Sequence, residues 1–86
     1  ARLKNSNGWT WVPSNQLLAD QVVLVEQGEL VPADGKLLSA NAVLDLSVLD
    51  GESRPRQIHH GFPIKAGSRL LSKNAEVLVE KGGAQT

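Results

Sequence analysis

The residues of this chain with the clearest chemical potential lie in one short stretch, Leu49-Asp50-Gly51-Glu52-Ser53-Arg54-Pro55. Asp-Gly is a strong turn signal, because glycine accepts the positive φ angles that tight turns demand. A side chain displayed at such a turn projects away from the core. We therefore expect Glu52 to be offered to something outside its own domain, the alternative being a solvated acid in a hairpin turn.

Two carboxylates near this turn raise the alternative of an independent hydrolase. In that interpretation Asp45 and Glu52 would act as a pair. Such an enzyme would also need a nucleophile, oxyanion donors and a substrate cleft. The sequence indicates none of these, so we do not favour a hydrolase that acts alone.

Short apolar runs separated by turn residues predict the elements that position the turn. The runs recur at intervals close to the roughly 8–12 residues of an all-β sandwich or barrel, and their β-branched valines favour a pleated surface. Alternation along residues 76–80 predicts that Val77 and Val79 share one face. The strands expected are residues 9–12, 22–26, 36–39, 42–46, 62–66, 69–71 and 75–80.

Glycine pairs predict the breaks between these strands, and one short helix is expected. The helix candidate is residues 14–19, with Ser14 as a cap, although it is too short to persist without packing. Turns are expected at Asn7-Gly8, Gln27-Gly28, Asp34-Gly35, Asp50-Gly51 and His60-Gly61, and Lys81-Gly82-Gly83 is expected to end the last strand.

The composition restricts the classes of function. The 86 residues suit one small domain, which can bury only about 60% of the surface of its unfolded chain. Nine basic residues balance nine acidic ones, which disfavours a broad nucleic-acid-binding surface. The lack of cysteine excludes disulfides and thiolate metal sites, and no apolar run approaches the roughly 20 residues of a membrane span. Because the chain starts at Ala1 and contains no methionine, we expect it to be cut from a longer protein.

Several glycine-containing motifs occur in an order that resembles a known family. The chain reads Gly28-Glu29-Leu30-Val31-Pro32-Ala33-Asp34-Gly35, then Asp45 through Leu49, then Asp50-Gly51-Glu52-Ser53-x-Pro55, and later Ala66-Gly67-Ser68. This order resembles the actuator domain of P-type cation-transporting ATPases, whose signature loop is Thr-Gly-Glu-Ser. The resemblance spans roughly residues 16–86 and implies a distorted jelly roll, similar to a double-stranded β-helix.

The resemblance also implies a role for each residue of the loop. Glu52 would orient and deprotonate the water that attacks an aspartyl phosphate on another domain, and Gly51 would allow close approach of the backbone. Ser53 would stabilise the turn, and Pro55 would stiffen its exit. Asp50 departs from the threonine of the family and adds a second negative charge.

Other polar and aromatic residues leave alternatives open. Asp45 either braces the loop by accepting backbone hydrogen bonds or is an exposed acid at a strand end. For Asp34 we prefer a simple turn residue, and for His59-His60 a solvated pair rather than a metal site. Trp9 and Trp11 should face the same side, and we favour the core over an exposed patch. Arg54 and Arg56 either contact phosphate or an acidic partner, or only aid solubility.

By resemblance, the chain is interpreted as a single actuator domain over residues 1–86. Residues 1–15 would form a hairpin or arm, 16–82 a β core with the catalytic loop 49–55, and 83–86 a tail. The parent protein would be a heavy-metal pump, with copper as the expected cargo, that uses ATP and Mg²⁺ in its other domains. The domain would be cytosolic, lie between transmembrane helices and act on the phosphorylation and nucleotide-binding domains of the same polypeptide. The competing interpretation is a stand-alone β binding or adaptor module.

Overall fold

The computed structural model describes residues 1–47, 51 and 54–81, and the regular structure of these residues is almost entirely β-strand. This confirms the all-β prediction. The elements are β1 (Arg2–Asn5), β2 (Gly8–Trp11), the 3-10 helix η1 (Ser14–Gln16), β3 (Val22–Val25), β4 (Asp34–Leu37), β5 (Asn41–Asp45), β6 (Pro55–His59), β7 (Pro63–Ile64), β8 (Arg69–Leu70) and β9 (Ala75–Lys81).

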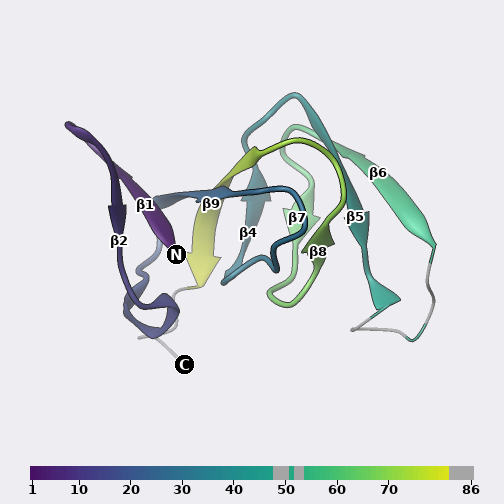
Figure 1. The fold of residues 1–86 in the computed structure, drawn as a ribbon, viewed down its shortest axis with the longest axis horizontal. Helices are drawn as coiled ribbons and strands as arrows, with labels where there is room; N and C mark the ends of the chain where they lie inside the picture. Colours follow the sequence, from purple (N-terminus) through teal and green to yellow (C-terminus); the bar gives the residue numbers. More distant parts are fainter. Residues whose placement is uncertain (48–50, 52–53, 82–86) are drawn as a thin grey trace.

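The strands form two antiparallel sheets. The larger sheet has the order β2-β1-β3-β9-β4-β7, and the smaller has the order β6-β5-β8. The β1–β2 hairpin lies at one end of the molecule, and β5 and β6 lie at the other (Figure 1). The ends of β5 and β6 that the candidate loop joins therefore belong to the small sheet, at the end of the molecule opposite the N-terminal hairpin.

The core lies between the two sheets and follows the period-two alternation of the strands. Val77 and Val79 of β9 are buried, whereas Glu80 is exposed, as the alternating pattern predicts. The small sheet contributes Ala42 and Leu44 from β5. The remaining buried apolar side chains are Leu17, Val23, Val25, Val31, Ala33, Leu37, Ile58, Ile64, Leu70 and Ala75.

The strand ranges expected from the sequence include neither β1 nor β6, although a hairpin or arm is expected over residues 1–15. In β6 only Ile58 is buried, so the strand carries no alternation of apolar residues that a sequence pattern could reveal. In β1 no residue is fully buried. Both strands form because their backbones pair with a neighbour: β1 with β2 and β3, and β6 with β5.

The turn expected at Asp34-Gly35 is wrong, because these residues begin strand β4. A β-bulge lies between Asp34 and Gly35 where β4 pairs with β9. A Cβ atom at Gly35 would lie 2.1 Å from the backbone oxygen of Leu78. Glycine is required here for close approach of two strands rather than for a turn.

The expected helix is shorter than the sequence suggests. Within the expected range 14–19 only Ser14–Gln16 is helical, and the cap position is occupied by Pro13 without a side-chain hydrogen bond, so the assignment of Ser14 as the cap is wrong. None of the helices in the described part of the chain has the length and apolar character needed to span a bilayer.

The two tryptophans lie on the surface, which corrects the preference for the core. Trp9 is 40% exposed and Trp11 is 68% exposed. They do share one side of β2, where Trp11 lies opposite Arg2 and Trp9 opposite Lys4. Each ring therefore has a basic side chain near one face: the Arg2 guanidinium is 4.7 Å from the centre of the Trp11 ring, and the Lys4 ammonium is 6.0 Å from the centre of the Trp9 ring.

Candidate catalytic loop and its supports

The candidate site is the connection between β5 and β6. Asp45, the last residue of β5, lies opposite Pro55, the first residue of β6, so this pair closes the base of the connection. Asp50, Glu52 and Ser53, the other candidate residues, lie outside the described residues, and their roles stay predictions. Asp45, Gly51 and Pro55 are described, and they show how the ends of the connection are held.

Asp45 is tied to the start of the loop by a local hydrogen bond. The backbone N–H of Ser47 donates to Oδ1 of Asp45 at 2.9 Å. This bond and a second one with the Ser47 side chain hold the pKa of Asp45 below its ordinary value, and the positive charge of Arg69 acts in the same direction. Of the two alternatives left open for Asp45, the geometry favours the brace.

Gly51 occupies a backbone conformation that suits glycine. Its φ is +78°, and a Cβ atom added there would meet nothing within 4 Å. Its N–H donates to the backbone oxygen of Ser47 at 2.8 Å. The backbone angle is therefore a reason for glycine here, in addition to the close approach that the family resemblance implies.

Pro55 begins an edge strand of the small sheet. A proline lacks an N–H donor, so the first residue of an edge strand is one of the few positions where a sheet accepts it. Its fixed φ restricts the chain at the point where the loop rejoins the sheet. This position is consistent with the stiffening role expected for Pro55.

The motif segments that are far apart in the sequence lie side by side in the fold. The N–H of Val31 donates to the oxygen of Ser68 at 2.7 Å, and the N–H of Gly67 donates back to Val31 at 2.9 Å. Asp34 is not a simple turn residue, because its Oδ1 accepts a hydrogen bond of 2.8 Å from the N–H of Ala66. The segment 28–35 is thus fastened along the segment 66–70.

Arg69 and Ser47 are contributors to the site that sequence reasoning missed. Arg69 lies opposite Asp45 in the pairing of β8 with β5, and its Nη1 donates to the oxygen of Gly28 at 2.7 Å. Ser47 provides both the donor to Asp45 and the acceptor for Gly51. The partners of Arg69 are distant in sequence, so no local pattern could have identified it.

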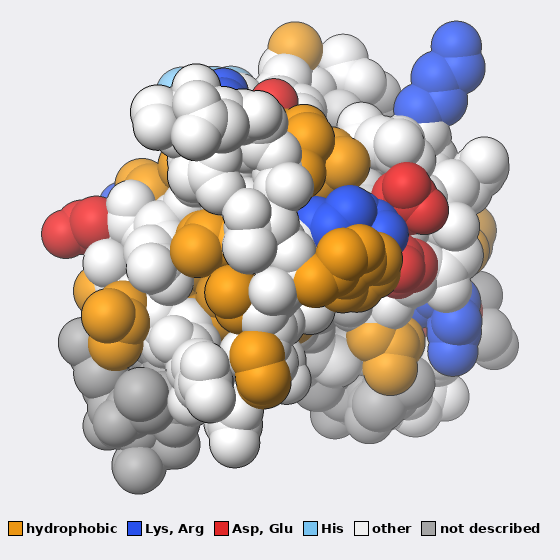
Figure 2. Space-filling model, turned by 60° about the vertical axis from the view of Figure 1, so that its left-hand side comes forward, with side chains coloured by type: hydrophobic (Ala, Val, Ile, Leu, Met, Phe, Trp, Pro, Cys, Tyr) orange, Lys and Arg blue, Asp and Glu red, His pale blue; other side chains and the backbone are white. Residues whose placement is uncertain are grey.

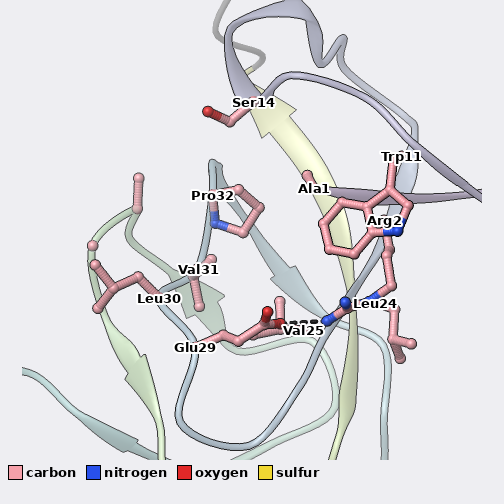
Figure 3. Close-up of a pocket in the computed structure, with 12 residues that line it drawn as sticks. Ala1, Arg2, Trp11, Ser14, Leu24, Val25, Glu29, Leu30, Val31 and Pro32 are labelled. Atoms are coloured by element: carbon pink, nitrogen blue, oxygen red, sulfur yellow. Dashed lines mark hydrogen bonds and ion pairs between the residues drawn. The ribbon is translucent and has the colours of Figure 1, made fainter.

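A pocket lies beside the N-terminal hairpin, away from the candidate loop. This pocket of about 610 Å³ is bordered by the hairpin, the segment after Gly28 and the turn at Ala66-Gly67. Arg2 extends past the Trp11 ring toward Glu29 in the pocket (Figure 3). Arg2 also lies 3.3 Å from Glu26, so its charge is matched by nearby carboxylates.

The surface in this region mixes charge types. Figure 2 shows basic and acidic side chains side by side, with hydrophobic side chains scattered among uncharged ones. In and beside β6 of the small sheet, Arg54, His59 and His60 are exposed, and the Arg56 guanidinium lies 4.8 Å from the centre of the Phe62 ring. Among the residues that the structure describes, no group of three or more His, Cys, Asp or Glu side chains is arranged to hold a metal ion.

The arrangement of motifs can be compared with known families. The sequence profile of the P-type ATPase actuator domain matches residues 1–86, which is the whole chain. This chain is a P-type ATPase actuator domain. The family resemblance inferred from the glycine motifs is therefore confirmed.

Curated relatives of this actuator domain are heavy-metal ATPases. It is 34% identical over 80 residues to a cadmium, zinc and cobalt-transporting ATPase of Bacillus subtilis, covering 93% of this chain and 11% of that protein. It is 40% identical over 60 residues to a copper-exporting P-type ATPase of Staphylococcus haemolyticus, covering 69% of this chain and 8% of that protein. The actuator domain thus spans about a tenth of the length of these relatives.

Solved structures agree with the fold of the domain. One structure of a zinc-transporting PIB-type ATPase matches with a TM-score of 0.90 and 32% identity, over 94% of this chain and 13% of that one. A second structure of a zinc-transporting PIB-type ATPase, in a different state, matches with a TM-score of 0.88 and 31% identity, over 99% of this chain and 15% of that one. Because the relatives differ in their cargo, the family match alone does not single out copper.

Proposed function

We propose that this actuator domain serves a heavy-metal-transporting P-type ATPase and promotes hydrolysis of the aspartyl-phosphate intermediate of the pump. The observation that carries the proposal is the base of the β5–β6 connection, where Asp45 and Pro55 face each other and enclose the sequence Asp50-Gly51-Glu52-Ser53. The relatives described above are metal-transporting ATPases, which supports ATP-driven metal transport as the activity of the parent protein.

In this proposal, Glu52 acts on a water molecule at another domain. Its carboxylate orients the water for in-line attack on the phosphoryl group and accepts a proton from it. Gly51 supplies a turn without a side chain, so the backbone can approach the phosphorylated site closely. Ser53 and Asp50 lie near Glu52 in the same stretch.

The other steps of the pump belong to parts of the polypeptide outside this chain. The sequence contains no Asp-Lys-Thr-Gly-Thr phosphorylation loop, so the aspartate that is phosphorylated, the ATP and the Mg²⁺ belong to the phosphorylation and nucleotide-binding domains. The actuator domain would face the cytosol between transmembrane helices. On its own it is not expected to hydrolyse ATP.

Copper is the cargo that we propose for the parent pump. The support is the pattern Asp-x-Ser-x-x-x-Gly-Glu-Ser-x-Pro, which begins at Asp45 and resembles copper pumps, together with the copper-exporting relative. The test is metal-stimulated ATPase activity of the full-length protein. Stimulation by Cu⁺ but not by Zn²⁺, Cd²⁺ or Co²⁺ supports copper. Stimulation by Zn²⁺, Cd²⁺ or Co²⁺ but not by Cu⁺ would reject copper and favour a cargo like that of the cadmium, zinc and cobalt-transporting relative.

The catalytic proposal is tested by replacing Glu52 in the full-length pump. Glu52→Ala should allow the phosphoenzyme to form from ATP but should cause it to accumulate, because the attacking water loses its base. Glu80→Ala is the matched control, since it removes an exposed acid of β9, a strand of the large sheet. Normal decay of the phosphoenzyme in Glu52→Ala would reject the proposed role.

A further inference from the structure

Arg69 lies between two segments near the candidate loop: the end of β5 at Asp45 and the turn at Gly28. It occupies β8, which pairs with β5, and its register partner is Asp45. The neighbouring pair in the same ladder, Leu44 and Leu70, is buried. Because side chains alternate between the faces of a sheet, Asp45 and Arg69 extend together from the opposite, outer face.

The guanidinium of Arg69 is itself held in place. Its Nη1 donates to the backbone oxygen of Gly28 at 2.7 Å. Backbone bonds fasten the same region, because Gly28 donates to Leu70 at 2.7 Å and Leu70 donates to Glu29 at 2.9 Å. A cation fixed in this way can act on a cross-strand neighbour without a large further loss of side-chain freedom.

Hydrogen bonds and one cross-strand pair connect the Gly28 segment with the start of the loop. The segment at Gly28 holds Arg69, Arg69 lies beside Asp45, and Asp45 accepts the N–H of Ser47. Ser47 in turn accepts the N–H of Gly51. Each link joins two described groups, and the last of them, Gly51, is beside Glu52 in the sequence.

We propose that Arg69 is a positioning residue of the catalytic loop, which restrains the Asp45 carboxylate through its positive charge and thereby the backbone N–H of Ser47, whose hydrogen bond this carboxylate accepts. The inference rests on the proposed function, because the loop is taken to deliver Glu52 to the phosphoenzyme. Arg69 contacts neither substrate nor water in this proposal. Its effect passes through Asp45.

The test measures decay of the phosphoenzyme in the full-length pump. Arg69→Met removes the charge and the donor but keeps a long side chain. Decay should slow about two- to fivefold, which is the rate change that corresponds to the loss of one cross-strand charge pair. Lys73→Met is the matched control, because it removes one exposed positive charge from the connection between β8 and β9, and it should leave decay unchanged.

Two further variants separate positioning from a general structural role. Arg69→Lys retains the charge and should recover part of the rate. In an Asp45→Asn background, Arg69→Met should cause little additional slowing, because the group through which Arg69 acts has lost its charge. Equal slowing in both backgrounds would mean that Arg69 does not act through Asp45, and would overturn the inference.

Two measurements keep the outcomes distinguishable. Formation of the phosphoenzyme from ATP reports whether each variant is folded, and if Arg69→Met fails this check, the comparison of Arg69→Lys with the unmodified pump decides. If Glu52→Ala blocks decay while both Arg69 variants decay normally, the inference about Arg69 fails and the proposed function stands. Normal decay in Glu52→Ala would remove the proposed function itself.

Discussion

Asp45 and Pro55 lie opposite each other in the antiparallel pair of β5 and β6, although nine positions separate them in the sequence. Asp45 is bonded to the following residues through the N–H of Ser47, and Pro55 restricts the backbone where the chain returns to the sheet. The connection that contains the candidate catalytic sequence therefore has a restrained residue at each end. A loop with fixed ends loses less conformational freedom when it docks on another domain.

Replacing Asp50 should change the rate of dephosphorylation in the full-length pump. At about 6 Å in water-like surroundings, two like charges repel by roughly 0.7 kcal/mol, and Asp50 adds such a charge beside Glu52 and an anionic phosphoryl group. Asp50→Thr should therefore speed phosphoenzyme decay about threefold. Glu80→Gln, which removes an acid from β9, should leave the rate as it was, and unchanged or slower decay in Asp50→Thr would reject this electrostatic explanation.

Asp45 should stabilise the fold in a pH-dependent manner. Its pKa is lowered from the ordinary value of 3.8, first of all by the hydrogen bond from Ser47, so the folded protein favours the ionised form more than the unfolded chain does. The stabilisation is complete above 3.8 and is lost as the pH falls through the lower pKa of the folded state.

The comparison that checks this dependence is between the unmodified domain and Asp45→Asn. The free energy of unfolding in urea, measured from about pH 6 down to about pH 2, should differ most at the upper end and converge at the lower end. Asn41→Asp, at the other end of β5, gives a control in which the carboxylate has no bond to Ser47. A difference that grows on acidification would contradict the assigned sign.

Adding a methyl group at Gly35 should destabilise the domain severely. The new Cβ would lie 2.1 Å from the backbone oxygen of Leu78, and backbone in a central pair of strands cannot move aside cheaply. We expect Gly35→Ala to cost about 3 kcal/mol or more in the free energy of unfolding. Gly28→Ala, where φ is +88° but space is open, should cost only about 1–2 kcal/mol. Equal costs would refute the close-approach explanation.

Replacing Trp11, the more exposed of the two tryptophans, should reduce the free energy of unfolding less than the size of its side chain suggests. Trp11 is 68% exposed and contacts the Arg2 guanidinium, so Trp11→Ala should cost about 1 kcal/mol or less. Leu17 is fully buried, and Leu17→Ala should cost about 2–5 kcal/mol. Urea unfolding followed by circular dichroism compares the two variants, and a larger loss for Trp11→Ala would show that the hairpin supports the core more than its exposure indicates.

Short-range patterns in the sequence were sufficient for several features of the domain. Asn7-Gly8, Gln27-Gly28 and His60-Gly61 mark turns because a glycine accepts positive φ, and these glycines have φ values of +119°, +88° and +85°. The alternation around Val77 and Val79 identifies a strand with one buried face. The order of the glycine motifs indicates the family. All of these signals can be read along the chain without knowing which segments pair in the fold.

Tertiary structure decided the features that depend on partners distant in the sequence. Asp34-Gly35 has the composition of a turn, yet the approach of β9 makes it a strand, and β6 forms through pairing with β5 although only Ile58 is buried. Trp11 is apolar but lies at the surface because no residue of β2 packs into the core. The supports of the loop, Arg69 above all, become neighbours of Asp45 only when β8 pairs with β5. Local sequence determines the preferences of the backbone, whereas contacts between strands determine which of those preferences the folded chain satisfies.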